Sequence, residues 1–208
     1  MAYKIAIIVG SLREGSLNRR VARSICALRG ENLDCSMVEI GDLPLYNQDY
    51  DALPSQPEAY VKFRDQVRSA DGVLFVSPEY NRGIPGVLKN AIDVGSRPYG
   101  ASVWDKKPAA IVTASPGAIG GFGANHQIRQ ACVFLNMPMM QQPEAYLGHV
   151  TDDSFDSDGK LKEGPLKELV KVLAHAFHDW VDMIHRSRQL LAEDSAHAAQ
   201  AAKAKEHA

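Results

Sequence analysis

The residues of this chain best suited to bind an anion lie in one short segment, which holds Ser11, Arg13, Ser16 and Asn18. A run of apolar residues stops at Gly10 and opens into these hydroxyl and amide side chains around one permanent positive charge. Charge-assisted hydrogen bonds contribute roughly 1.5–3 kcal/mol each, so a few of them would hold a phosphate monoester. An ordinary strand-to-helix turn with a solvated arginine could have the same residues. We call residues 10–18 the anion loop.

The anion loop matches none of the phosphate-binding motifs that bring a catalytic group of their own. A Walker A loop requires Gly-x4-Gly-Lys-Ser/Thr, whereas Gly15 is followed here by Ser16 and Leu17. The dinucleotide fingerprint G-x-G-x-x-G is absent after the first apolar run, and the loop contains no cysteine nucleophile. We therefore expect the loop to bind an anion without attacking it.

Two further loops follow apolar runs in the same way. Residues 72–77 lead into the sequence PEYN at 78–81, and residues 109–114 lead into a glycine-rich segment at 115–123. The carboxyl ends of neighbouring parallel strands meet at one edge of a sheet, and ligands bind there in such folds. Together, a phosphate cradle, a polar and aromatic turn and an open glycine-rich segment predict a site for a phosphorylated aromatic ligand.

The elements that position these loops are predicted from hydrophobic periodicity. The three apolar runs lack polar alternation, which is typical of strands buried on both faces of a parallel sheet. Helices are predicted at 18–29, 59–69, 87–96, 124–135 and 166–188, and further strands at 33–40 and 139–141. Repeated alternation of strand and helix predicts an α/β, doubly wound five-stranded parallel sheet with helices on both faces. Residues 1–188 are expected to form one domain, and the Ala-, Lys- and Glu-rich residues 189–208 a frayed helix or disordered tail.

Composition excludes several classes of protein. The 208 residues are 45% hydrophobic and 23% charged, with a net charge of -2, so nucleic acid is not an expected partner. No apolar run reaches the ~20 residues of a membrane span and no secretory signal is recognisable, so a cytoplasmic protein is expected. Three cysteines without a C-x-x-C pair argue against a disulfide framework or a zinc site, and we expect each to be a small core residue.

Two other clusters of metal-binding residue types have simpler interpretations. His175, His178 and His185 fall on the last predicted helix without a clear cysteine or carboxylate partner. Four aspartates between residues 152 and 158 resemble a calcium loop, but Gly159 is out of register with the EF-hand pattern. We expect no metal site and interpret the aspartates as a solvated acidic turn.

The three loops together resemble those of the NADPH-dependent FMN reductase family, including its quinone- and chromate-reducing members. The similar segments are GSLREGSLN, PEYNRGIPGVLKNAID and SPGAIGG, and the likeness covers about residues 3–186. The resemblance implies a flavodoxin-like fold with strand order 2-1-3-4-5 and FMN as the bound ligand.

The resemblance also implies residue roles. The FMN phosphate and ribityl chain would be surrounded by Ser11, Arg13, Ser16, Leu17 and Asn18. Pro78, Glu79, Tyr80 and Asn81 would run along the isoalloxazine, and Ser115, Pro116 and Gly117 would close the other side. Arg82 and Arg97 would either attract the NADPH phosphates or an anionic acceptor, or remain solvated.

The activity implied by the resemblance is hydride transfer from NADPH or NADH, through bound FMN, to a second substrate in a ping-pong mechanism. Quinones, free flavins, azo compounds and oxidised metal anions such as chromate are the expected acceptors. The flavin N5 carries the hydride, so no side chain is assigned as catalytic. Two alternatives stay open: a flavodoxin-like electron carrier, which the small net charge disfavours, and a redox sensor that does not turn over.

Assembly into a homodimer or homotetramer is likewise expected from the resemblance. Tyr99, Trp104 and Phe122 are predicted to be exposed and to serve such contacts. His126 and Glu144 are predicted at a subunit contact, with His126 standing where the family has an aromatic hydroxyl.

Overall fold

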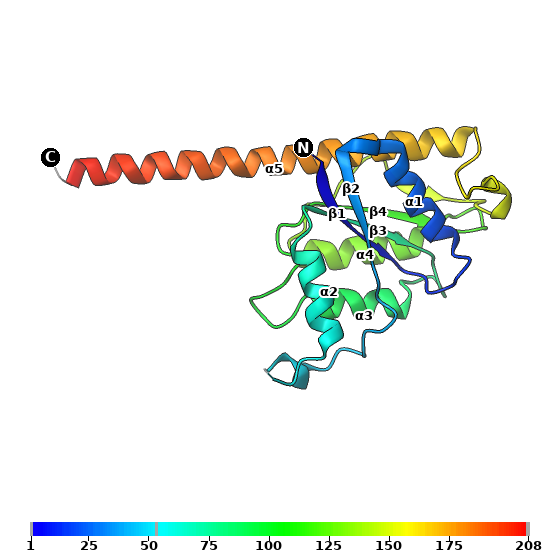
Figure 1. Cartoon of the computed structure of the whole chain (residues 1–208), viewed down its shortest axis with the longest axis horizontal. Coiled ribbons are helices and arrows are strands. Elements are labelled where there is room, and N and C mark those ends of the chain that lie inside the picture. The colour runs from blue at the N-terminus through cyan, green and yellow to red at the C-terminus, as the bar shows by residue number, and fades with distance from the viewer. Residues whose placement is uncertain (1, 53, 207–208) are drawn as a thin grey trace.

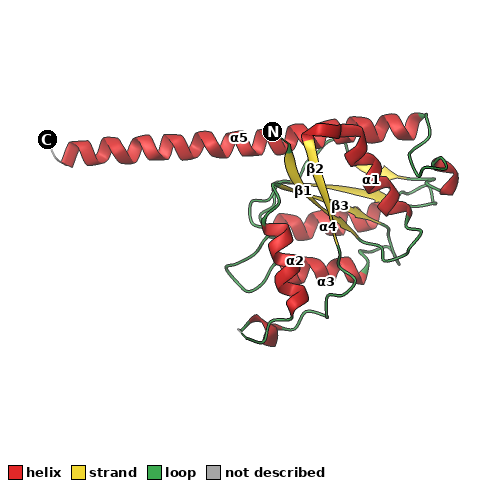
Figure 2. Ribbon diagram, in the orientation of Figure 1, coloured by secondary structure: helices red, strands yellow, loops and turns green. Residues whose placement is uncertain are grey.

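A computed structural model describes residues 2–52 and 54–206, and its centre is a five-stranded parallel sheet (Figures 1 and 2). The strand order is β2-β1-β3-β4-β5, as predicted. The strands are β1 (Tyr3–Val9), β2 (Leu33–Val38), β3 (Gly72–Ser77), β4 (Ala109–Ala114) and β5 (Ala145–Leu147). All residues of β3 and β4 are buried, which is the expected consequence of an apolar run with helices on both sides.

Five α-helices cover the two faces of the sheet. The helices α1 (Leu17–Arg29) and α5 (Pro165–Glu206) pack on one face, and α2 (Glu58–Arg68), α3 (Gly86–Gly95) and α4 (Phe122–Phe134) pack on the other (Figure 1). Alternate residues of β1 feed the two cores, with Ile5 and Ile7 on the α1 side and Ala6 and Ile8 on the α2 side. Short 3-10 helices occupy Gly30–Asn32, Gln48–Asp51 and Asp152–Ser154. The buried central strands thus hold their carboxyl-end loops on a rigid base.

The fifth strand was predicted in the wrong place. Met139 makes only an isolated parallel bridge with Ala109, and the strand that completes the sheet is Ala145–Leu147, six residues later. Pro143 lies between the two segments and has no N–H group to continue a ladder. The chain therefore touches the start of β4, leaves it, and returns beside its carboxyl end.

The last helix is longer than the amphipathic pattern predicted. Its apolar face, including Val170, Leu173, Phe177 and Val181, is buried against the sheet. The helix then continues through residue 188 to Glu206, away from the rest of the molecule, with residues 189–199 all exposed (Figure 1). Despite the 42 residues of α5, no helix in the described part of the chain combines the length and apolarity needed to cross a bilayer.

Two of the three cysteines form a disulfide, which the sequence interpretation had argued against. Cys26 on α1 and Cys35 on β2 are joined, with their Cα atoms 6.3 Å apart, whereas Cys132 is free and buried as expected. The C-x8-C spacing matches no cysteine motif. The two residues meet because the 3-10 turn Gly30–Asn32 folds α1 back onto the neighbouring edge strand.

Trp104 was predicted to be exposed but is completely buried. Its indole Nε1 donates to the Ile92 carbonyl at 2.8 Å, and its ring contacts those of Phe63 and Phe75. The other two aromatic residues in that prediction, Tyr99 and Phe122, are 92% and 49% exposed. Trp104 is therefore part of the α2–α3 core rather than a contact surface.

Candidate functional site

The three predicted loops meet at the carboxyl edge of the sheet. The parallel register pairs Val9 with Val76 and Ser77 with Thr113, so β1, β3 and β4 end side by side. The Gly10 N–H donates to the Val76 carbonyl at 2.9 Å, which lays the anion loop on the end of β3. A Cβ atom at Gly10 would lie 2.4 Å from Ser77 Oγ, so this approach requires glycine.

The anion loop presents a row of unused backbone donors. Residues 14–15 form a turn, but within the described residues no backbone N–H group from Ser11 to Asn18 makes a short, well-aligned hydrogen bond. The Ser16 hydroxyl accepts from the Arg19 N–H at 3.2 Å and so caps the start of α1. Because the N-terminus of a helix carries partial positive charge, these N–H groups have the arrangement that favours an anion.

One side chain of this loop, that of Asn18, has the geometry of a ligand contact. Asn18 is buried, and its Nδ2 donates to the Ala114 carbonyl at 3.1 Å, which ties the anion loop to the end of β4. Its Oδ1 is buried without a partner in the described chain. Such an acceptor is costly unless a ligand hydroxyl or N–H donates to it.

The remaining side chains of the loop differ in exposure. Ser11 and Ser16 are 4% and 3% exposed, and Leu17 is half-buried. Arg13 is exposed and forms no hydrogen bond or ion pair with any described residue, so its guanidinium is available to an anion in solution. The loop thus combines a fixed backbone cradle with one free cation.

The second loop forms a tight turn at the start of α3. Tyr80 and Gly83 exchange backbone hydrogen bonds at 3.0 and 2.9 Å, and Asn81 and Arg82 between them have φ values of 51° and 64°. Two consecutive left-handed residues that are not glycine are unusual, and such conformations cluster at functional sites. The turn leaves the side chains of Tyr80, Asn81 and Arg82 exposed.

The carboxylate of Glu79 is used inside the protein. Its Oε2 accepts from the Ala124 N–H at 2.9 Å, at the N-terminus of α4, and its Oε1 lies 3.5 Å from Arg82 Nη1. A negative charge there is favoured by the helix dipole. Of the residues predicted to run along an aromatic ligand, Glu79 can therefore contribute only its backbone.

The third loop is held by the segment that follows β5. The Val150 and His149 N–H groups donate to the carbonyls of Ser115 and Gly117, at 3.1 and 3.3 Å. Gly120 has a φ of 64°, and a Cβ atom there would lie 2.4 Å from the Tyr146 backbone. Residues 116–119 remain exposed, so Pro116 and Gly117 offer an open backbone surface to a flat ligand.

Arg97 does not join the site within one chain, contrary to its predicted place near the mouth. It follows the C-terminus of α3, whereas the second loop lies at the N-terminus of that helix. The 10 residues of α3 separate the two positions by about 15 Å. Of the two arginines considered, only Arg82 lies beside the three loops.

The metal-binding residue types are engaged in other contacts. His178 pairs with Asp179 at 2.9 Å, and His185 Nε2 lies 3.0 Å from the Asp71 carbonyl oxygen. The Asp156 carboxylate accepts from the backbone N–H groups of Asp158 and Lys160, which closes a turn. The described residues contain no group of three histidines, cysteines or acidic residues that could hold a metal ion.

An aromatic cluster beside the third loop was missed in part by sequence reasoning. The Tyr146 hydroxyl and His126 Nε2 lie 3.1 Å apart, and the Phe122 ring packs against both. Burial, and then the nearby Glu144 carboxylate, raise the pKa of Tyr146. An aromatic hydroxyl thus lies beside His126 within the same chain, on Tyr146 of β5, a strand whose place was not predicted.

The chain is similar in sequence and in fold to several known proteins. Residues 3–152 match the sequence profile of the NADPH-dependent FMN reductase family. A quinone reductase of Pseudomonas putida is 54% identical over 181 residues, covering 87% of this chain and 96% of the relative. A 2-hydroxy-1,4-benzoquinone reductase of a Burkholderia species is 42% identical over 181 residues, covering 87% and 97%. The solved structure of FerB, a flavoenzyme NAD(P)H:(acceptor) oxidoreductase from Paracoccus denitrificans, superposes with a TM-score of 0.83 at 35% identity, covering 88% and 98%.

Proposed function

Because the chain belongs to the NADPH-dependent FMN reductase family, we propose that it is a quinone reductase. The family places it among the oxidoreductases that use FMN and NAD(P)H. When bound, FMN supplies hydride acceptance from the nicotinamide and hydride donation to the acceptor. The residues of the chain bind the cofactor, orient it and keep one side of it open.

The observation that carries the proposal is the anion loop with its unused polar groups. Free backbone N–H groups at the start of α1 suit the doubly charged phosphate of FMN, and Arg13 adds a mobile cation beside them. The unpartnered Asn18 Oδ1 suits a donor from the ribityl hydroxyls. We assign Ser11, Arg13, Ser16, Leu17 and Asn18 to the phosphate and ribityl chain.

The other two loops would hold the isoalloxazine ring. In this proposal the backbone of Pro78, Glu79 and Tyr80 runs along the ring, and the exposed Asn81 amide reaches its polar edge. The Ser115–Pro116–Gly117 backbone closes the opposite side. Arg82, which is 74% exposed at its side chain, stands at the rim and would attract the phosphates of NAD(P)H.

The acceptor is proposed from the relatives and from the openness of the site. Two relatives are named for quinone reduction, and residues 116–119 leave an exposed surface where a flat quinone could replace the nicotinamide. One shared position for donor and acceptor implies a ping-pong mechanism. Free flavins, azo compounds and chromate are further proposed acceptors of the same site.

An anaerobic experiment with the FMN-loaded protein tests this function. Addition of NADPH or NADH should bleach the flavin absorbance, and subsequent addition of a benzoquinone should restore it within one turnover. Steady-state initial rates should give parallel double-reciprocal lines. Flavin that stays yellow with both nucleotides contradicts the reductase proposal, and bleaching without reoxidation by any acceptor indicates a sensor.

We further propose that the enzyme assembles into a homodimer or homotetramer and acts in the cytoplasm. The exposed face of α4 and the adjacent loop present Phe134, Val133 and Tyr99, which are 88%, 65% and 92% exposed. An apolar patch of this kind on an otherwise polar surface favours a contact with another copy. Sedimentation at micromolar concentration tests the assembly, and a single species of one-chain mass contradicts it.

A further inference from the structure

We propose that Cys26 and Cys35 are a reversible oxidation site, at which a hydroperoxide converts two thiols into the disulfide and so locks α1 to the edge strand β2. This site lies outside the three loops, and the proposal does not depend on the reductase activity. Three observations support it: the position of the two cysteines, their accessibility compared with that of Cys132, and the two elements that they join.

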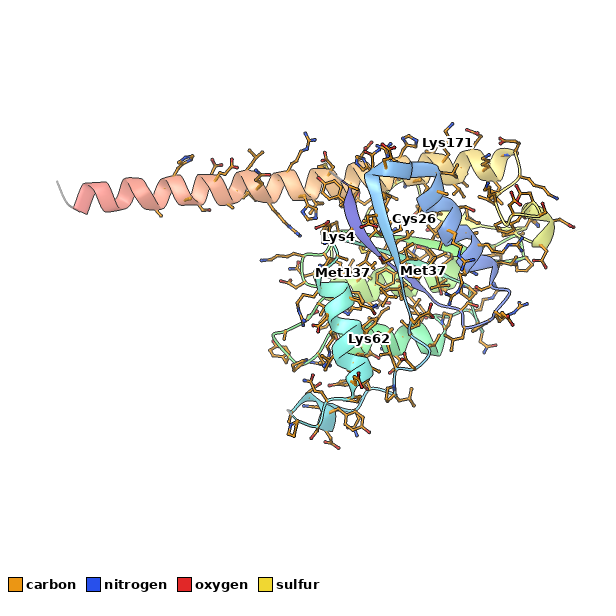
Figure 3. All side chains as sticks on the ribbon, viewed as in Figure 1. Lys4, Cys26, Met37, Lys62, Met137 and Lys171 are labelled. Atoms are coloured by element: carbon orange, nitrogen blue, oxygen red, sulfur yellow. A yellow bond between two sulfur atoms is a disulfide. The ribbon has the colours of Figure 1, made fainter. Side chains whose placement is uncertain are left out.

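The position of the two residues allows the cross-link without a change of fold. Their Cα atoms are 6.3 Å apart, inside the range of about 4.4–6.8 Å that native disulfides occupy. Cys35 lies in the ladder opposite Ile5. Cys26 lies in the last turn of α1 (Figure 3). The fold therefore places the two residues at a separation that suits the cross-link.

Accessibility separates this pair from the third cysteine. Cys26 and Cys35 are both partly exposed at the rim of the core between α1 and the sheet, so a small oxidant can reach them. Cys132 is fully buried in α4, and burial raises the pKa of its thiol to about 12. Because the thiolate is the reactive form, Cys132 is inert at neutral pH and serves as an internal control.

The chemistry balances with the hydroperoxide as the only co-reactant. The thiolate of one cysteine attacks the O–O bond, which breaks to give a sulfenic acid and an alcohol, or water when the oxidant is hydrogen peroxide. The second thiolate then attacks that sulfur and displaces hydroxide, which leaves as water. Two thiols are oxidised by two electrons, the peroxide is reduced by two, and a dithiol reductant reverses the reaction by exchange.

The location of the site indicates what oxidation does. β2 is an edge strand, paired only with β1 among the described strands, and edge strands are the easiest to open. α1 begins at the anion loop, its apolar face is buried in the core, and near its C-terminal end Arg29 Nη2 lies 3.1 Å from His178 Nδ1. The disulfide closes this short helix-to-strand connection, so it stabilises the element on which the anion loop is mounted.

The test uses the full-length, FMN-loaded protein, reduced with dithiothreitol, desalted, and then treated with hydrogen peroxide. Peptide mapping after alkylation should show a Cys26–Cys35 link, with Cys132 unmodified. The melting temperature should rise by about 5–10 °C on oxidation, from the entropy of closing a loop of this size in a chain of this length. A second dithiothreitol treatment should return both thiols and the lower melting temperature.

Two cysteine variants test whether the shift in melting temperature comes from the Cys26–Cys35 link. Cys35→Ser should abolish the oxidation-dependent shift, and Cys132→Ala should retain it in full. The proposal is overturned if peroxide leaves Cys26 and Cys35 free, if it oxidises them without linking them, or if the linked and reduced forms melt at the same temperature. None of these results would bear on flavin reduction by NAD(P)H, which is measured separately on the same samples.

Discussion

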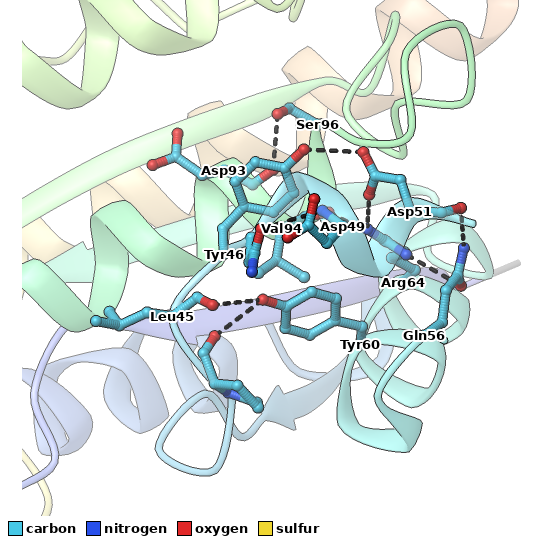
Figure 4. Close-up of polar contacts among 12 residues, drawn as sticks. Leu45, Tyr46, Asp49, Asp51, Gln56, Tyr60, Arg64, Asp93, Val94 and Ser96 are labelled. Carbon is cyan, nitrogen blue, oxygen red and sulfur yellow. Dashed lines mark hydrogen bonds and ion pairs between the residues drawn. The ribbon is translucent and has the colours of Figure 1, made fainter. Parts of the chain in front are cut away.

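Arg64 and Arg13 show two opposite uses of an arginine in this molecule. Arg64 is 3% exposed, between α2 and α3, where its Nε and Nη1 donate hydrogen bonds to protein acceptors and its Nη2 forms an ion pair with Asp51 without a hydrogen bond to a described residue (Figure 4). Its Nε donates to the Val94 carbonyl at 2.9 Å, its Nη1 to Gln56 Oε1 at 3.2 Å, and its Nη2 lies 3.5 Å from Asp51 Oδ1. Arg13 is exposed and pairs with no described residue.

The polar groups around Arg64 are mostly hydrogen-bonded to one another, whereas those around Arg13 are mostly free of partners in the described chain. Around Arg64, the Tyr46 hydroxyl donates to Asp51 Oδ2 at 2.8 Å, and the Tyr60 hydroxyl lies within bonding distance of two carbonyls (Figure 4). Around Arg13, neither the backbone N–H groups nor Asn18 Oδ1 makes a well-aligned hydrogen bond with any residue that the structure describes. Polar groups that are buried and paired hold a structure together, whereas polar groups held in place without partners are ready for a ligand.

The largest expected effect comes from breaking the paired region. Arg64→Met should lower the free energy of unfolding by about 3–5 kcal/mol, because Asp51 and the Val94 carbonyl would lose a buried partner. FMN affinity of the folded fraction should stay unchanged, since the site is at the opposite end of α3. Urea unfolding and FMN titration measure the two quantities. Arg68→Met, which removes an exposed cation of the same helix, is the control and should cost well under about 1 kcal/mol.

Removing Arg13 should lower the affinity for FMN and leave the stability of the protein unchanged. Arg13→Ala should raise the FMN dissociation constant roughly ten-fold or more, from the loss of a charged hydrogen bond worth about 1.5–3 kcal/mol, and should leave apoprotein stability unchanged. Riboflavin, which lacks the phosphate, should bind the variant and the parent equally. Arg23→Ala, an exposed arginine of α1 outside the loop, is the control. Equal FMN retention by Arg13→Ala and the parent after dialysis would contradict the assignment of the loop.

Asn18 belongs to both categories, since its Nδ2 is paired and its Oδ1 is not. Asn18→Ala should therefore lower both apoprotein stability and FMN affinity, each by about 1 kcal/mol. Asn18→Asp keeps the shape but sets a negative charge against the Ala114 carbonyl and the phosphate, so it should weaken FMN binding further. Loss of stability without loss of affinity would assign Asn18 to structure alone.

The smallest expected effect concerns an exposed ion pair near the start of α1. The hydrogen bond from Arg19, at 2.9 Å, holds the pKa of Glu39 below its ordinary value. A carboxylate with a depressed folded-state pKa stabilises the protein above its unfolded pKa and loses that contribution as pH falls through the folded pKa. Glu39→Gln should remove about 0.2–1 kcal/mol at pH 7 and nothing at pH 2. Glu31→Gln, without an ion pair in the described chain, is the control in urea melts at both pH values.

The sequence was sufficient to predict those elements whose burial is visible in their own pattern of apolar residues. β1, β3 and β4 were predicted because a strand buried on both faces must be apolar throughout, and the helices because their spacing matches one buried face. β5 was misplaced because a strand of three residues is too short to show a hydrophobic periodicity. The sequence left open whether residues 189–208 are helical or disordered, because an Ala-, Lys- and Glu-rich segment without an apolar face does not distinguish the two.

The sequence also predicted which three loops gather, since strands of a parallel sheet direct their carboxyl ends to one edge. How each side chain at that edge is used became clear from the packed structure. Asn18 bonds to Ala114 across 96 positions, Glu79 turns into α4, Arg97 lies beyond the far end of α3, and Cys26 meets Cys35. Periodicity is a property of neighbouring residues, whereas a hydrogen bond or a disulfide depends on distances that form only when the elements pack.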